Sequence, residues 1–198
     1  MHLGHDDAHW VRYNAGQGNR PVRPLCRSAM DRAGPPGQAV DLGCGSGVET
    51  RALLNAGWQV HAVDGSPETR PLLLRTIGGV HNRLTVEVAH YAELTSFPPA
   101  DLIYAGYSLP YQPPDSFGRI WELLRTALRP GGLLAVDLFG DHDSWAGDES
   151  MTFLTGTQAR ALFDGLELLS WDEEDEDGPA FGGAKHWHVY TAIARRPL

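Results

Sequence analysis

The fold is decided by the stretch Val40-Asp41-Leu42-Gly43-Cys44-Gly45-Ser46-Gly47. A short apolar run that starts at Gln38 leads into it, and a segment with helical character, 48–55, follows it. Glycines let a backbone turn sharply and approach a ligand without a Cβ atom in the way. A glycine-rich turn between a strand and a helix therefore predicts a ligand-binding unit rather than an ordinary loop.

Short apolar runs and amphipathic segments alternate along the rest of the chain. Strands are expected at 38–42, 59–63, 84–88, 102–105, 133–139, 166–171 and 187–194, and helices at 48–55, 66–77, 116–128 and 157–163. Ser66 followed by Pro67 is typical of a helix N-terminus, with the serine as N-cap. Five strand–helix alternations in a row predict an α/β fold, in which helices cover both faces of a mostly parallel sheet.

The chain is expected to form one domain, because 198 residues is about the length of a single one. A Gly-Pro-Pro-Gly cluster at 34–37 separates an N-terminal arm, 1–37, from the core, 38–198. Six consecutive acids, 172–177, are expected to form a solvated loop between the last two strands. Those two strands should then pair antiparallel at one edge of the sheet.

Composition and charge exclude several classes of protein. The chain has 16 basic and 25 acidic residues, a net charge of −9, which is a poor electrostatic match for nucleic acid or an anionic membrane. No apolar stretch approaches the ~20 residues that cross a bilayer, and the N-terminus does not resemble a signal peptide. Two cysteines are too few for a disulfide framework. We expect a soluble, cytoplasmic protein with a small-molecule partner; the oligomeric state stays open.

An acid ends the second predicted strand. Asp64 is placed to accept hydrogen bonds from the hydroxyls of a ribose. The glycines at 43, 45 and 47 depart from the dinucleotide pattern G-x-G-x-x-G, in which the third glycine would fall at Val48. The carboxylate of Asp41 suits an ammonium group better than a pyrophosphate. Together these residues predict a nucleoside-containing cofactor with a cationic amino-acid end.

With these motifs in place, the chain resembles the class I S-adenosylmethionine-dependent methyltransferases. The matching segments are 41–47, 63–67, 101–103 and 128–132, in the order found in that family. The resemblance implies a Rossmann-like, seven-stranded sheet with a reversed final strand. It also implies methyl transfer from S-adenosylmethionine to a small-molecule acceptor by in-line displacement, with S-adenosylhomocysteine as product. The compact size, the Trp10–Tyr13 arm and the segment 185–188 are similar to the tellurite-resistance or thiopurine-type branch.

The resemblance assigns cofactor-binding roles to residues in the turns and the arm. Gly43 to Gly45 would line the methionine part, Asp64 would hold the ribose, and His90 with Tyr91 would flank the adenine, where many members carry an acid in place of the histidine. The expected cofactor-binding residues are Tyr13, Asp41, Gly43, Cys44, Gly45, Asp64, Gly65, Ser66, His90, Tyr91, Ala105 and Tyr107. Cys44 is expected to be a small turn residue, with a reactive thiol as the alternative.

Tyr107 and His142 are the catalytic candidates. Methyl transfer needs alignment, exclusion of water and, for some acceptors, removal of a proton, so no catalytic triad is expected. Tyr107 lies in the aromatic segment 104–111 after a strand, where it either contacts the acceptor or packs in the pocket wall. His142 lies between two aspartates and is either a general base or a solvated loop residue.

Two further features leave alternatives open. The arm could close over the cofactor as a lid, with Arg12 or Arg20 reaching its carboxylate, or it could pack on the sheet edge as a helix. His186 and His188 have the spacing of metal ligands, with Asp141 or Asp143 as partners. Because no third ligand stands out, a hydrogen-bonded edge strand is the favoured interpretation and no metal is expected.

Two other functions compete with methyl transfer. An NAD-dependent oxidoreductase would use a similar sheet, but Val48 and the missing second dinucleotide half argue against it. A non-catalytic protein that binds S-adenosylmethionine and regulates a partner would carry the same motifs. Only binding and turnover experiments separate these three functions.

Overall fold

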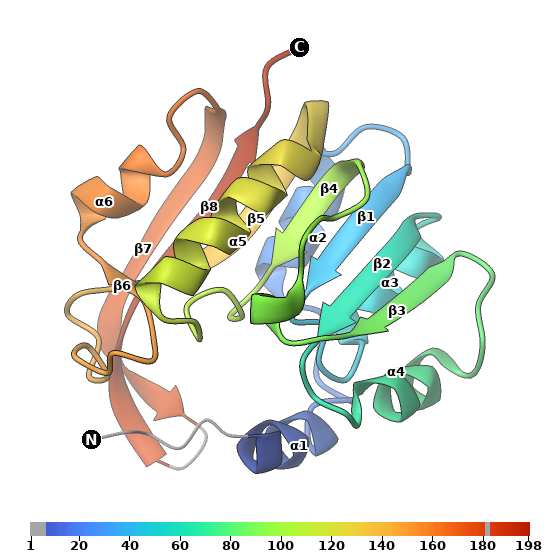
Figure 1. The fold of residues 1–198 in the computed structure, drawn as a ribbon, viewed down its shortest axis with the longest axis horizontal. Coiled ribbons are helices and arrows are strands. Elements are labelled where there is room, and N and C mark those ends of the chain that lie inside the picture. The colour runs from blue at the N-terminus through green and yellow to red at the C-terminus, as the bar shows by residue number, and fades with distance from the viewer. Residues whose placement is uncertain (1–6, 181–182) are drawn as a thin grey trace.

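The computed structural model describes residues 7–180 and 183–198. Its central sheet has the strand order β3-β2-β1-β4-β5-β8-β7, as Figure 1 shows. The first five strands in this order run parallel, whereas β8 is antiparallel to β5 and to β7. This arrangement confirms the predicted α/β fold with its antiparallel edge. A two-residue strand, β6, pairs with β5 off this path and adds an eighth strand to the expected seven.

The strands and helices follow the predicted order closely. The strands are β1 (Gln38–Leu42), β2 (Gln59–Asp64), β3 (Leu84–Val88), β4 (Ala100–Ala105), β5 (Leu128–Gly140), β6 (Phe153–Leu154), β7 (Glu167–Ala180) and β8 (Gly183–Arg195). The helices are α1 (Asp7–Ala15), α2 (Pro24–Arg32), α3 (Val48–Asn55), α4 (Thr69–Ile77), α5 (Pro114–Ala127) and α6 (Gly156–Ala161), with a 3-10 turn η1 (Tyr91–Glu93).

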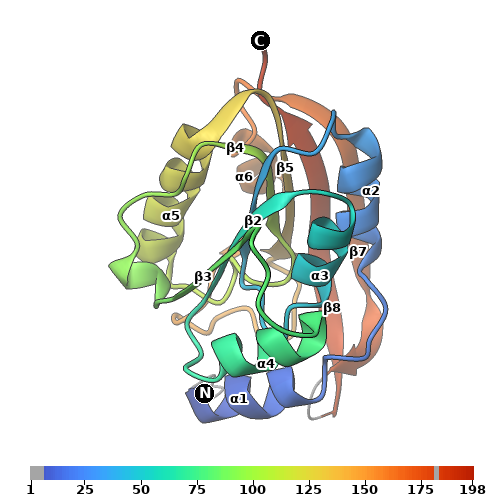
Figure 2. The ribbon, with the colours of Figure 1, turned by 90° about the vertical axis from the view of Figure 1, so that its right-hand side faces the viewer.

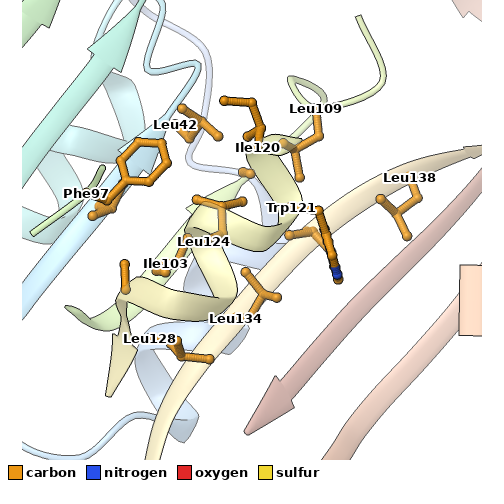
Figure 3. Close-up of a cluster of buried hydrophobic side chains, with 14 of the residues drawn as sticks. Leu42, Phe97, Ile103, Leu109, Ile120, Trp121, Leu124, Leu128, Leu134 and Leu138 are labelled. Atoms are coloured by element: carbon orange, nitrogen blue, oxygen red, sulfur yellow. The ribbon is translucent and has the colours of Figure 1, made fainter. Parts of the chain in front are cut away.

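Helices cover both faces of the sheet because successive strand residues alternate between the faces. One core lies under α5 and α6, where Ile120, Trp121 and Leu124 pack over strand residues such as Ile103 and Leu134 (Figure 3). The second core lies under α2, α3 and α4 on the opposite face. Figure 2 shows α5 on one side of the sheet and α2 with α3 on the other. None of the described helices is long and apolar enough to span a membrane.

The predicted N-cap at Ser66 is wrong. Helix α4 begins at Thr69, and the Ser66 hydroxyl makes no hydrogen bond to the described residues. Instead, the Asp64 carboxylate accepts from the Ser66 backbone N–H at 2.9 Å and from the Thr69 hydroxyl at 3.0 Å. A charged acceptor at the end of β2 binds donors more strongly than a neutral hydroxyl does, so it takes over the capping of this turn.

The predicted loop at 172–177 is also wrong, because these acids belong to strand β7 and pair with β8. Strand alternation places Glu173, Asp175 and Asp177 opposite Tyr190, His188 and His186, and it turns the intervening acids to the other face. The extended backbone therefore keeps acids that are adjacent in sequence on opposite faces of the strand. It also places some of the six acids opposite histidines. In Figure 1 this β7–β8 ribbon extends beyond the carboxyl ends of the parallel strands, next to α1.

Candidate functional site

A pocket of about 270 Å³ lies at the carboxyl edge of the parallel strands. Parallel strands bring their carboxyl ends to one edge, and the turns after β1 to β4 meet there. Helix α1 closes the pocket from below in the view of Figure 1. Ten predicted site residues line it: Tyr13, Gly43, Cys44, Gly45, Asp64, Gly65, Ser66, His90, Tyr91 and Tyr107.

The glycine turn leaves no room for side chains. Gly43, Gly45 and Gly47 have φ values of 76°, 50° and 84°, a region that favours glycine. A Cβ at Gly43 would lie 2.2 Å from the Cβ of Ser108, and one at Gly45 would lie 2.8 Å from the Asn14 amide oxygen. The turn thus keeps its bare backbone toward the pocket while α1 packs directly on it.

Asp64 organises the second turn of the pocket. Its Oδ2 accepts from the Gly45 N–H at 2.8 Å, and its Oδ1 accepts from Ser66 N–H and the Thr69 hydroxyl. An ionised carboxylate offers about four lone-pair positions. Because three protein donors already use this carboxylate, it has room for one ribose hydroxyl rather than the two expected.

Arg20 and Glu49 form a charged pair at the other end of the pocket. The two terminal nitrogens of Arg20 bind the Glu49 carboxylate at 2.6 and 2.5 Å, and Glu49 also accepts from the Arg23 N–H at 3.0 Å. Burial alone would raise the pKa of Glu49, but the hydrogen bonds and charge of Arg20 outweigh it and lower that pKa. The sequence predicts a cofactor carboxylate as the partner of Arg20. The structure shows in addition the carboxylate of Glu49, which fixes the orientation of the Arg20 guanidinium.

Three unpartnered polar atoms converge on this pocket. Within residues 7–180 and 183–198, four buried side-chain polar atoms lack a hydrogen bond, and three belong to pocket-lining residues: Arg20 Nε, Ser66 Oγ and Tyr104 Oη. A buried polar atom without a partner costs about 1–3 kcal/mol. Three such atoms around one pocket indicate a polar ligand that supplies the missing partners.

Tyr107 has a strained backbone at the mouth of the pocket. Its φ of 49° makes it the one non-glycine residue with positive φ in the described chain. Its N–H donates to the buried carboxylate of Asp137, which also accepts from the Thr191 hydroxyl at 2.6 Å. Burial raises the pKa of Asp137 to about 6. The Arg23 guanidinium lies 4.7 Å from the centre of the Tyr107 ring and holds it from the other side.

Two of the predicted cofactor residues lie behind the pocket wall. Asp41 is 1% exposed, and its carboxylate accepts from the Thr50 hydroxyl at 2.6 Å under the start of α3. Burial raises the pKa of Asp41 to about 7. Ala105 is fully buried at the end of β4. Neither lines the pocket, so the expected direct contact of Asp41 with a ligand ammonium is not what the structure shows.

The structure does not bring His142 to the pocket, which corrects its role as candidate base. Its side chain is 63% exposed, hydrogen-bonds Asp175 at 3.0 Å and stacks on His188 with ring centres 4.6 Å apart. These contacts raise the pKa of His142 above its usual value, the hydrogen bond to Asp175 first and its charge second. His142 is a surface residue of the turn after β5, where it contacts the ribbon through Asp175 and His188.

A histidine–carboxylate network replaces the metal ligand set considered from the sequence. His186 lies between Asp175 and Asp177, with nitrogen–oxygen distances of 2.7 and 2.9 Å. Asp143, one of the acids considered, instead binds the buried ammonium of Lys185 at 2.5 Å. His142, Asp175 and His188 do offer ligand atoms within 4.8 Å of one another. Protein hydrogen bonds already engage Asp175 and His188 in this network.

Sequence reasoning missed part of the wall that faces the glycine turn. The additional lining residues are Asn14, Gln17, Arg23, Glu49 and Gln112. Tyr104, Ser108 and Tyr111 also line the pocket, and they belong to the aromatic segment 104–111 already considered from the sequence. A signal for part of the missed set was present, since positions 10, 13, 14 and 17 share one face of a helix. Glu49 gave no such signal, because its role depends on a contact between distant segments.

Residues 39–132 match a family model described as a methyltransferase domain. This match covers the glycine turn, the Asp64 turn and the first four strands, which are the parts that build the pocket. Over this part of its length the chain is similar to S-adenosylmethionine-dependent methyltransferases. The resemblance seen in the sequence is thereby confirmed.

Relatives and solved structures agree with this assignment. This chain is 36% identical over 126 residues to a trans-aconitate 2-methyltransferase of Deinococcus radiodurans, covering 62% of this chain and 45% of the relative. The chain spans about half the length of the curated relatives it matches.

The fold is similar to that of TehB from Haemophilus influenzae, with a TM-score of 0.78, 14% identity, and coverage of 93% of this chain and 65% of TehB. It is also similar to the N-methyltransferase NodS from Bradyrhizobium japonicum in complex with S-adenosyl-L-homocysteine, with a TM-score of 0.73, 14% identity, and coverage of 96% and 98%. Both structures share the fold of this chain.

The pocket fits S-adenosylmethionine, the cofactor that the sequence predicts. Its bare glycine turn accepts a close ligand, and the free N–H of Arg20 suits a ligand carboxylate. The Ser66 hydroxyl and the remaining position on Asp64 suit the hydroxyls of a ribose. The donor set thus matches a ligand with an amino-acid end and a nucleoside end.

Proposed function

We propose that this chain transfers the methyl group of S-adenosylmethionine to a small-molecule acceptor. The observation that carries the proposal is a junction of two cavities at Tyr107. A second cavity of about 540 Å³ lies between α1, the segment after β4 and the β7–β8 ribbon. It shares six lining residues with the first pocket: Trp10, Tyr13, Gln17, Arg23, Tyr107 and Tyr111. A donor in one cavity and an acceptor in the other would therefore meet there.

Each part of the first pocket has a role in this proposal. Arg20 would hold the carboxylate of the cofactor, Asp64 one ribose hydroxyl, and Ser66 a second polar group nearby. When bound, S-adenosylmethionine supplies a methyl group activated by a positively charged sulfur. The protein then has to align the acceptor and exclude water, which requires no nucleophile of its own.

Tyr107 would align the acceptor at the junction. Its backbone is held by Asp137 and its ring by Arg23, so the ring has little freedom to move. Burial raises the pKa of the Tyr107 phenol, and the negative charges of Asp137 and Glu174 add to this effect. The phenol therefore stays neutral at physiological pH. A positioning role for the ring fits these contacts better than proton removal does.

Helix α1 would serve as the lid over the cofactor. Asn14, 5% exposed, packs against Gly45; Tyr13 lines the pocket from the same helix and Gln17 from the turn that follows it. A cofactor enclosed in this way would be shielded from water. We also propose a cytoplasmic location and no nucleic-acid partner, supported by two free buried cysteines and by the acidic ribbon.

Release of S-adenosylhomocysteine in the presence of an acceptor panel tests the proposal. The panel contains thiols, amines, hydroxyl compounds and carboxylates, with trans-aconitate included because a relative is named for it. We expect acceptor-dependent release with at least one class. Cofactor binding without turnover on any class would instead favour the non-catalytic regulatory alternative.

A further inference from the structure

The second cavity has aromatic walls. Its rings are Trp10, Tyr13, Tyr107, Tyr111, Trp145 and Trp187. Trp187 meets Tyr107 edge to face with ring centres 5.8 Å apart and lies 5.7 Å from Trp145. Aromatic faces carry partial negative charge, so they bind flat rings and cations favourably. The walls thus suit a flat acceptor.

The same two indoles already hold a cation. The Lys185 ammonium lies 3.5 Å from the ring centre of Trp145 and 3.8 Å from that of Trp187. This lysine does not line the cavity, and Asp143 neutralises it at 2.5 Å. Lys185 therefore shows the affinity of these rings for a cation without giving the cavity a positive charge.

Carboxylates from the ribbon also line the cavity, beside the Trp187 indole. Glu174 and Glu176 pair with Val189 and Trp187 in the register, so both stand on the face that carries the Trp187 indole. Neither glutamate side chain has a hydrogen bond or ion pair to the described residues. Asp177 also lines the cavity, although its carboxylate binds His186 at 2.9 Å.

One cation faces these acids. Arg23 lines the cavity, but its guanidinium lies over the Tyr107 ring and donates to the Tyr13 hydroxyl at 3.3 Å. The carboxylates of Glu49 and Asp137 also stabilise the positive charge of the Arg23 guanidinium. The described residues that line the cavity therefore give it a negative electrostatic potential. An acceptor with several carboxylates would be repelled here.

We propose that the acceptor is a flat aromatic amine or nitrogen heterocycle, neutral or cationic overall, with its ring against Trp187 and its nitrogen side toward Glu174 and Glu176. This inference rests on the proposed methyl-transfer function and specifies the acceptor class of the same site. It separates this chain from its trans-aconitate relative, because the described residues that line the cavity include no set of free cations for a polycarboxylate.

Methyl transfer to a nitrogen of such an acceptor conserves atoms and electrons. The lone pair of the neutral nitrogen forms a bond to the methyl carbon as the carbon–sulfur bond breaks, and the electron pair of the broken bond stays on sulfur. Where the nitrogen bears a hydrogen, the methylated nitrogen passes one proton to a carboxylate of the cavity or to water; a ring nitrogen without a hydrogen keeps the positive charge in the product. An acceptor that binds as a cation first loses a proton along the same route.

Calorimetry on the full chain saturated with S-adenosylhomocysteine tests the acceptor class with two probes. Phenethylamine and 3-phenylpropanoate share a ring and a short linker but carry opposite charges. We expect the amine to bind about tenfold more tightly at low salt, with a smaller difference at high salt. The double variant Glu174→Gln with Glu176→Gln should weaken amine binding about fivefold and leave S-adenosylhomocysteine binding unchanged.

The control is Glu173→Gln, a neighbour on the same strand that faces the opposite side and binds His188 at 3.1 Å. This variant should leave amine binding unchanged. Tighter binding of the propanoate, or binding of neither probe, overturns the acceptor class while leaving cofactor binding intact. Failure of S-adenosylhomocysteine itself to bind would overturn the proposed function, so the two failures are distinguishable.

Discussion

Arg20 joins the arm to the first pocket through contacts that a lysine would not reproduce. Its two terminal nitrogens bind Glu49 as a fork, and its Nε remains without a protein partner beside the pocket. A planar guanidinium can hold one carboxylate with one edge while it presents another N–H elsewhere. Its geometry therefore allows a second carboxylate, that of the cofactor, to be recognised.

Arg20→Lys should weaken the binding of S-adenosylhomocysteine about tenfold or more, because a hydrogen bond to a charged group contributes about 1.5–3 kcal/mol. Isothermal titration calorimetry measures this change directly. Arg27→Lys, at an exposed position of the same arm, is the matched control and should have no effect. Equal affinities for the two variants would show that Arg20 does not contact the cofactor.

Asp41 gives a prediction on stability. Burial raises its pKa from about 3.8 to about 7 in the folded protein. Between these values the folded state binds a proton that the unfolded state has released, so this group lowers the free energy of unfolding as pH rises. Asp41→Asn should be more stable than the wild type by roughly 1–3 kcal/mol at about pH 8, with little gain at about pH 4. Urea unfolding at both pH values checks this; a constant difference would contradict it.

At the scale of the elements, the β7–β8 ribbon depends on histidines paired with acids. His186 has a carboxylate at each ring nitrogen, and the hydrogen bond to Asp175, the first of these, raises its pKa. The contacts with His142 and His186 also lower the pKa of Asp175 to about 2. The ribbon forms one wall of the second cavity, so its order affects the acceptor site.

We expect the ion pairs of the protonated His186 with its carboxylates to stabilise the fold fully below about pH 6.5, the usual pKa of an unfolded histidine. This stabilisation should be lost as the pH rises through the higher pKa of His186 in the folded protein. An NMR titration of the imidazole signals measures that folded value. His186→Gln should lower the melting temperature at about pH 6 and leave it nearly unchanged at about pH 9. An imidazole that titrates at or below its usual pKa would refute the pairing.

Helix α1 yields a prediction of its own. Deletion of residues 1–19 removes Tyr13, Asn14 and Gln17 from the pocket wall but leaves the sheet and its two cores. S-adenosylhomocysteine binding should weaken about tenfold or more. Calorimetry gives the affinity, and circular dichroism checks that the core stays folded. Unchanged affinity in a folded core would rule out the lid.

Much of the molecule was predictable because its pattern is local. The glycine turn and Asp64 revealed the cofactor site, since spacing along the chain sets their positions. The acidic run was misread because six like charges suggest solvent exposure, whereas the strand alternates them between two faces. Glu49 and the acidic wall of the second cavity were not predictable, because they depend on how the arm and the ribbon fold back onto the sheet.

At the scale of the whole molecule, the net charge of −9 is distributed by the fold. Part of the acidic run meets histidines on the outer face of the ribbon, and part faces the second cavity. The cofactor pocket instead contains a paired arginine and glutamate. One chain thus provides a polar donor pocket and a negatively charged aromatic acceptor cavity that meet at Tyr107.

The most direct test of the central claim is a calorimetric titration of the full chain with S-adenosylhomocysteine and, separately, with NAD. The glycine spacing, the free N–H of Arg20 and the Asp64 turn predict tight, one-to-one binding of S-adenosylhomocysteine and no binding of NAD. Binding of NAD without S-adenosylhomocysteine would contradict the account and favour an oxidoreductase.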